Sequence, residues 1–260
     1  MNPFPISKSQ PATVVGSLPG SGQGDLMTRR TAASHASFAL PLLRPGMRIL
    51  DAGCGSGSIT LGLAERVRPG GVIGIDLSAD VLDFANQQAA DLKLNAAFIQ
   101  ANVHELPFGP AEFDGVFAHA LLGQIAHSLS ALRELFRVMK PGAFIAVRSQ
   151  DLAGLVLEPS DREVDAALES CLESLAESGA ETRAGRRLAG WLRTAGFHHV
   201  TPSAGYEMHP APRAFVESLV APLARQGRED EVSFLRNWAE RPAAMAAQPW
   251  FEAVGWKPWG

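Results

Sequence analysis

Short apolar runs alternate with longer stretches of helical periodicity between residues 47 and 147. The apolar runs predict five strands, at 47–52, 72–75, 96–100, 113–118 and 143–147. Apolar residues at helical spacing predict helices over 58–67, from Ser78 onward, and before the Lys140-Pro141-Gly142 stop. This rhythm of strand and helix indicates βαβ units, so the sequence predicts an α/β fold with a mostly parallel central sheet flanked by helices.

The flanking segments follow other patterns. Residues 1–24 are poor in apolar residues, which predicts a flexible N-terminal arm, and 28–43 has helical spacing although Pro41 weakens its last turn. A capping box of Ser160 and Glu163 predicts an inserted helix. Further helices are expected over 184–195 and 212–245, and strands over 197–201 and around Tyr206. We therefore expect a core at 25–210 with a helical insertion at about 158–180, followed by a helical cap or tail at 211–260.

A glycine loop connects the first predicted strand to the following helix. It reads Asp51-Ala52-Gly53-Cys54-Gly55-Ser56-Gly57. Glycines permit a sharp turn and a close approach to a ligand, and the helix N-terminus behind them attracts an anion. That anion is a pyrophosphate in a dinucleotide enzyme and a methionine carboxylate in a methyl-donor enzyme.

The spacing of the glycines favours a methyl-donor enzyme over a dinucleotide enzyme. The dinucleotide fingerprint has glycines at its first, third and sixth positions, but the sixth position here is Ser58. Asp76 closes the second predicted strand, where a carboxylate can accept hydrogen bonds from two ribose hydroxyls.

Composition narrows the classes of partner. The formal net charge of −4 argues against sequence-independent binding of nucleic acid, which needs a basic surface. Two distant cysteines form neither a disulfide framework nor a four-ligand zinc site, and no apolar run is long enough to insert into a membrane. We expect a cytoplasmic protein with no metal, and a homodimer is one option.

Several motifs in order resemble a known family. The segment from Leu50 to Gly57 and the following Gly74-Ile75-Asp76-Leu77-Ser78 resemble class I S-adenosylmethionine-dependent methyltransferases. The segments 103–108 and 132–142 resemble the ubiquinone/menaquinone-biosynthesis type within that class, which acts on small molecules. The resemblance covers roughly residues 29–201 and implies a Rossmann-like fold, S-adenosyl-L-methionine as methyl donor and a small-molecule acceptor.

The resemblance also assigns residues to the donor pocket. It implies that Asp51, Gly53, Gly55 and Gly57 form the methionine side, that Asp76 holds the ribose and that Leu77 lies against the adenine. Asn102 stands beside Val103 where the family usually has an aspartate that meets the adenine amino group; its amide oxygen can still accept. The remaining residues expected at the donor are Cys54 and Ala118.

Several candidate side chains have alternative interpretations. Cys54 is either a thiol activated by the helix N-terminus or, as we favour, a small packing residue. His119 matches the border of the methyl-transfer site, and we name it as the candidate catalytic residue, acting as a base or as polar lining. Arg148 pairs with either an acidic acceptor or a helix end. The tryptophans of the tail pack the cap or stack on a flat acceptor.

Two other functions stay open at this point. One is a non-catalytic module that binds the donor as a sensor or an assembly partner, and the other is an NAD-dependent oxidoreductase. For the enzyme, we expect direct in-line displacement, with a lid formed by the N-terminal helix and the helices that start near Ser160 and Pro212.

Overall fold

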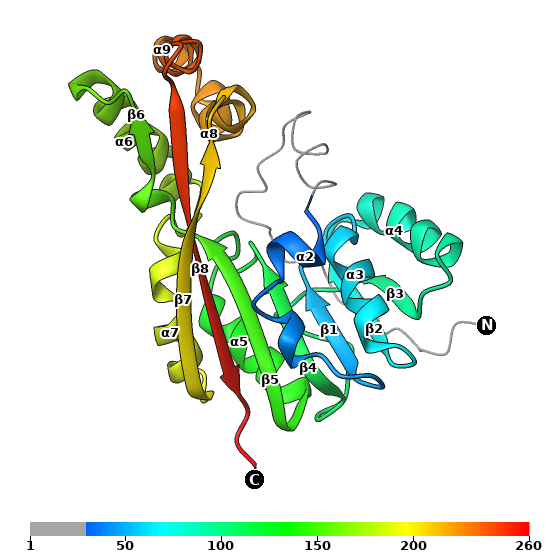
Figure 1. Ribbon diagram of the computed structural model, residues 1–260. Coiled ribbons are helices and arrows are strands. Elements are labelled where there is room, and N and C mark those ends of the chain that lie inside the picture. Colours follow the sequence, from blue (N-terminus) through cyan, green and yellow to red (C-terminus); the bar gives the residue numbers. More distant parts are fainter. Residues whose placement is uncertain (1–29, 260) are drawn as a thin grey trace.

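The computed structural model of the chain describes residues 30–259 (Figure 1). The arm predicted at 1–24 lies outside these residues. The strands are β1 Arg48–Ala52, β2 Gly71–Asp76, β3 Ala96–Gln100, β4 Phe113–His119, β5 Met139–Gln150, β6 Val156–Glu158, β7 His198–His209 and β8 Met245–Trp256. The helices are α2 Ala32–His35, α3 Ser58–Val67, α4 Ala79–Asp91, α5 Ser128–Val138, α6 Arg162–Glu177, α7 Ala184–Thr194, α8 Arg213–Arg225 and α9 Glu229–Ala239, with short 3₁₀ turns η1 Leu40–Leu42 and η2 Leu152–Gly154.

The described strands form one sheet in the order β3-β2-β1-β4-β5-β8-β6, with β7 paired to the other edge of β8. The first five of these run parallel, and β8 is antiparallel to β5. The order reverses direction between β1 and β4, which is the place where open α/β sheets bind ligands. The predicted α/β fold with a mostly parallel sheet is confirmed.

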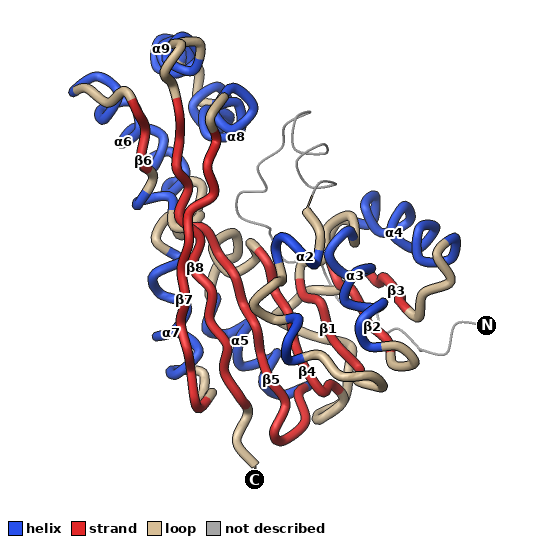
Figure 2. Tube along the Cα trace, viewed as in Figure 1, coloured by secondary structure: helices blue, strands red, loops and turns tan. Residues whose placement is uncertain are grey.

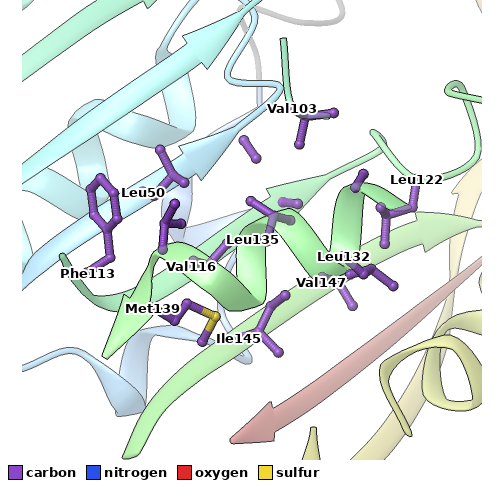
Figure 3. Packing of buried hydrophobic residues seen from close by; sticks show 14 of the residues in the cluster. Leu50, Val103, Phe113, Val116, Leu122, Leu132, Leu135, Met139, Ile145 and Val147 are labelled. Atoms are coloured by element: carbon purple, nitrogen blue, oxygen red, sulfur yellow. The ribbon is translucent and has the colours of Figure 1, made fainter. Parts of the chain in front are cut away.

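Alternating residues of the parallel strands pack into two layers of helices. On one face, Leu50 and Val116 pack with α5 and α7, as Figure 3 shows for the residues around Leu132 and Leu135. On the other face, Ile49 and neighbouring residues pack against α2 and α3. Because adjacent strand residues point to opposite faces, near-continuous apolar strands are what a sheet covered on both sides requires.

A separate helical cap lies at one end of the sheet. The long β7–β8 ribbon extends beyond the end of β5, and helices α6, α8 and α9 gather at its far end (Figure 2). These helices, with β6 and the start of β8, bury their own apolar cluster around Trp238 and Leu235. The cap therefore has a core distinct from that of the sheet, and residues from both parts line the cavity described below.

Four sequence-based expectations are wrong at the level of elements. The helix expected over 28–43 shrinks to α2, a turn and η1, because Pro41 stands at the start of η1. The tail is helical only as far as Ala239. Met245–Trp256 form the strand β8, which pairs with β5 and with β7. The expected helix stop at Lys140-Pro141-Gly142 lies within β5. The N-cap of α6 is Asp161 instead of Ser160, and the Asp161 carboxylate accepts from the Glu163 and Val164 amides. By contrast, the strands expected over 197–201 and around Tyr206 are confirmed as parts of a single strand, β7.

Candidate active site

A cavity of about 1590 Å³ opens at the carboxyl ends of the parallel strands. One wall is built by the segments that follow β1, β2, β3 and β4, and the opposite wall by the end of β7 and by α8. Pockets for one drug-sized ligand are typically 300–1,000 Å³. This cavity therefore has room for two ligands side by side.

The glycine loop lies on the core side of the cavity. Gly53 has a φ of +74°, and a Cβ there would lie 3.0 Å from the Leu121 side chain. The Gly53 and Cys54 amides donate to the Ile75 carbonyl at 2.8 and 2.9 Å, which fixes the loop to the end of β2. Gly55 lines the cavity just before the N-terminus of α3, where unpaired amides and the helix dipole favour an anion.

Gly57 has another role. It is the N-cap of α3 with a φ of +79°, and a Cβ there would lie 2.6 Å from the Phe98 ring. It is not among the cavity-lining residues. Gly57 thus permits the close packing of α3 against β3 and α4, while Gly53 and Gly55 face the ligand space.

Asp51 is an acidic group buried at the floor of the cavity. It is 2% exposed, and the Thr60 hydroxyl donates to its Oδ2 at 2.5 Å. Burial raises the pKa of Asp51 to about 7, the Thr60 hydrogen bond opposes this shift, and nearby Asp76 adds to it. No cation among the described residues forms an ion pair with Asp51, so a ligand ammonium would supply the missing countercharge.

Asp76 is held in place by two backbone amides. The Gly55 amide donates to Oδ2 at 2.9 Å, and the Ser78 amide donates to Oδ1 at 3.0 Å. Each carboxylate oxygen keeps a further lone pair for a ligand hydroxyl. Ser78 occupies the N-cap position of α4 but makes no side-chain cap.

The other donor-pocket candidates fall into two groups. Leu77, Asn102 and Val103 line the cavity, and the Asn102 amide oxygen already accepts from the His104 amide at 3.0 Å. Ala118 is buried inside β4 between Ala52 and Val147, and it is not among the cavity-lining residues. The structure thus brings together all predicted donor residues except Gly57 and Ala118.

Cys54 lines the cavity, but its surroundings disfavour a thiolate. Burial, followed by the charges of Asp51 and Asp76, raises the pKa of the Cys54 thiol. A Cβ on Gly74 would lie 2.9 Å from its Sγ, so the thiol packs directly on β2. This environment favours the packing interpretation of Cys54.

His119 ends β4 at the boundary between the cavity and the sheet. Its ring stacks on Trp250, with centroids 4.9 Å apart, and meets the edge of the His35 ring at 5.3 Å. Neither ring nitrogen has a hydrogen-bond partner, and both are buried, because His119 is only 8% exposed. Burial, then Arg30, Arg148 and His35, lowers the pKa of His119 well below its usual range, so the ring is neutral and a poor general base.

Further lining residues come from the N-terminal segment that was expected to form part of the lid, and from two strands that the sequence patterns did not connect with the site. Arg30 and His35 reach the cavity from the N-terminal side, Glu207 and His209 from β7, and Gln248 from β8. His209 Nε2 lies 3.4 Å from Gln248 Oε1, and the Gln248 amide donates to Gln150 at 3.2 Å. No local pattern marks these residues, but the apolar and aromatic run 244–256 could have indicated a buried strand.

The expected lid is only partly present at the cavity. Ala214, Phe215 and Ser218 of α8 line it, as does His35 of α2, whereas no residue of α6 does. Within residues 30–259, no group of three or more His, Cys, Asp or Glu side chains could hold a metal ion. None of the helices described is long and apolar enough to cross a membrane.

Comparison with known proteins identifies the family. Residues 43–196 match the family model described as a methyltransferase domain. The chain belongs to the methyltransferase family. This match spans more than half of the chain, from the segment before β1 to the end of α7, and includes the glycine loop and Asp76. The resemblance to class I S-adenosylmethionine-dependent methyltransferases is thereby confirmed.

Individual relatives agree with this assignment. An uncharacterized methyltransferase of Schizosaccharomyces pombe is 34% identical over 175 residues, which cover 65% of this chain and 63% of the yeast protein. A demethylmenaquinone methyltransferase of Lactococcus lactis is 41% identical over 99 residues, covering 37% of this chain and 39% of that protein. The methyltransferase chain thus spans less than two thirds of the length of these curated relatives.

The fold also has solved counterparts. The YcgJ protein of Bacillus subtilis superposes with a TM-score of 0.65 at 15% identity, over 86% of this chain and 98% of that one. At this identity, the likeness supports the fold alone. The Rossmann-like architecture expected of the methyltransferase is confirmed.

Proposed function

We propose that this chain transfers the methyl group of S-adenosyl-L-methionine to a small-molecule acceptor. The observation that carries the proposal is the meeting of Asp51, the glycine loop and Asp76 at one end of a cavity large enough for two ligands. A buried acid without a countercharge suits the donor's ammonium group, and the N-terminus of α3 suits its carboxylate. Leu77 and Val103 supply apolar walls for the adenine.

The residues of the chain then act by binding and orientation. A sulfonium donor supplies a methyl group that is already strongly activated. The fixed loop and Asp76 hold one reactant, while the wall formed by β7 and α8 places the other, and together they exclude water. Such positioning contributes on the order of 7–11 kcal/mol to rate enhancement in well-oriented reactions. A dedicated base is needed only where the acceptor carries a proton with a high pKa, and the lowered pKa of His119 makes it a poor candidate for that role.

The first test is calorimetric titration of the purified chain with S-adenosylhomocysteine and, separately, with NAD. We expect micromolar binding of the former and none of the latter. Asp76→Ala should weaken binding about 10-fold or more, because it removes an acceptor for two hydroxyls. Asp83→Ala is the matched control: it removes an exposed carboxylate from α4 outside the cavity and should leave affinity unchanged.

Two outcomes would overturn the proposal. A folded chain that prefers NAD would indicate the oxidoreductase. A chain that binds S-adenosylhomocysteine but transfers no label from a methyl-labelled donor to any small molecule in a metabolite extract would indicate a binding module. The homodimer and the cytoplasmic location stay predictions, which sedimentation and cell fractionation can test.

A further inference from the structure

The cavity also holds a set of polar side chains that are not among the predicted donor residues. We call it the acceptor-end cluster, and it comprises Arg30, His35, His119, Gln150, Glu207 and Gln248, all of which line the cavity. These residues come from β4, β5, β7, β8, α2 and the segment just before α2. They take no part in the donor contacts proposed above, so they face whatever shares the cavity with the donor.

The first observation that points to a ligand at this cluster concerns His119. Both of its ring nitrogens are buried without a hydrogen-bond partner, while the ring is fixed between Trp250 and His35. An unsatisfied buried polar group typically costs about 1–3 kcal/mol. A ligand oxygen that accepted from the protonated nitrogen would remove one of these deficits.

The second observation is that the partly desolvated guanidinium groups of Arg30 and Arg148 both lie near the Trp250 indole. Arg148 lies 4.5 Å from the centroid of the Trp250 ring, and Arg30 lies 5.8 Å from it. Arg148 has a carboxylate neighbour, Glu252, at 3.5 Å, yet its Nη1 makes no hydrogen bond. Among the described residues, no carboxylate lies within ion-pair distance of Arg30, which lines the cavity.

Two carboxylates oppose this positive charge. Glu252 is shared between Arg148 and the Ser203 hydroxyl, which donates to it at 2.9 Å. Glu207 lines the cavity and interacts with Arg30, Arg148 and His35 over a longer range. Arg30 is therefore a half-buried, cavity-lining cation without a carboxylate at ion-pair distance, and an anionic ligand group would pair with it.

We infer that the acceptor binds as an anion, through a carboxylate or an ionised phenol or enol oxygen that pairs with Arg30 and accepts a hydrogen bond from His119. This inference rests on the proposed function and names the substrate class of the same cavity. Where the anionic atom is itself the nucleophile, its electron pair forms the bond to the methyl carbon. The carbon–sulfur bond breaks with its electrons left on sulfur, and no proton needs to be removed.

The test uses probes of one size and different charge. The chain is first saturated with S-adenosylhomocysteine, and 2-naphthoate, 2-naphthamide, 2-naphthol and 2-naphthylmethylamine are then titrated by calorimetry. We expect 2-naphthoate to bind about 10-fold more tightly than 2-naphthamide, the gain typical of one charge-assisted contact. If the site takes phenolates, 2-naphthol should gain affinity as the pH rises through its own pKa, whereas a carboxylate site would leave it weak throughout.

Substitutions test which residues cause the preference for 2-naphthoate over 2-naphthamide. Arg30→Gln should remove the advantage of 2-naphthoate and leave S-adenosylhomocysteine affinity unchanged. Arg225→Gln, which removes an exposed positive charge from the end of α8 outside the cavity, should retain that advantage. His119→Phe keeps a ring stacked on Trp250 but removes both nitrogens, and it should weaken 2-naphthoate and any phenolate alike.

The outcomes separate the two proposals. If S-adenosylhomocysteine does not bind, the proposed function fails before any probe is added. If it binds but the anionic and neutral probes bind equally, the inference is overturned alone. Tighter binding of 2-naphthylmethylamine, lost in Glu207→Gln, would also overturn it and assign the cluster to an amine acceptor.

Discussion

At the scale of single residues, we expect Asp51 to link stability to ligand binding. Its pKa rises from an unfolded value near 3.9 to about 7 because the folded chain buries it. The neutral form is thus favoured on folding, so this residue costs stability progressively as the pH rises from about 4 through 7. We expect Asp51→Asn to stabilise the ligand-free chain by about 1–3 kcal/mol at pH 8 and by much less at pH 5.

Denaturant unfolding at the two pH values measures this difference. In the same variant, calorimetry should show weaker S-adenosylhomocysteine binding, because the countercharge for the ligand ammonium is gone. Thr60→Val is a useful comparison: it removes the hydrogen bond to Asp51 but keeps the carboxylate. Equal stabilisation of Asp51→Asn at pH 5 and pH 8 would contradict the elevated pKa.

The sequence could predict that most of the proposed donor residues line one cavity, because these residues lie in short, ordered motifs. Asp51, the glycines and Asp76 lie at or directly after the ends of strands that the apolar pattern marks, and parallel strands bring their carboxyl ends to one edge. Arg30 and Glu207 join the cavity only through long-range packing of β7 and the N-terminal segment. Nothing local in their surroundings distinguishes them from exposed charges.

At the scale of elements, two glycines test how tightly the helices pack. Gly57 has a φ of +79°, and a Cβ there would lie 2.6 Å from Phe98 and 2.9 Å from Ala85. Gly190 lies in the exposed part of α7 with no atom within 4 Å of its Cβ position. We expect Gly57→Ala to destabilise the chain by about 2–4 kcal/mol and Gly190→Ala to stabilise it by about 0.5–1 kcal/mol.

Thermal unfolding of the two variants provides the comparison, since each adds the same methyl group. Gly57→Ala should also weaken S-adenosylhomocysteine binding, because α3 and the glycine loop would shift together. A Gly57→Ala chain as stable as the parent would mean that α3 and α4 adjust freely and that close packing does not fix the loop.

The elements that sequence reasoning predicted well are those whose pattern is local. Helix α3 and strand β3 begin and end at the predicted residues, because Gly, Pro and apolar period agree there. The tail strand β8 was missed because its apolar residues pair with β5 on one side and β7 on the other. A strand buried in this way has no alternation, and its pattern resembles the end of a helical segment.

At the scale of the whole molecule, the cap and the sheet have separate apolar cores that share one cavity. Trp238 is 1% exposed at the centre of the cap cluster, and its indole N–H donates to the Pro159 carbonyl at 2.8 Å. The residues proposed to bind the donor belong to the sheet side, whereas α8 of the cap supplies part of the opposite wall. The two binding functions should therefore respond differently when the cap is weakened.

We expect Trp238→Ala to destabilise the cap by about 3–5 kcal/mol, because it removes a large buried side chain and leaves a carbonyl unpaired. Hydrogen exchange should accelerate in α6, α8 and α9 and stay slow in β1 and β2, since local unfolding follows separate cores. S-adenosylhomocysteine affinity should change by less than about 3-fold, because its predicted contacts lie outside the cap, while 2-naphthoate affinity should fall as the α8 wall loosens.

Trp259→Ala, which truncates an exposed tryptophan, is the matched control. Faster exchange in β1 together with loss of S-adenosylhomocysteine binding would instead mean that cap and sheet unfold as one unit, and that the donor site depends on both.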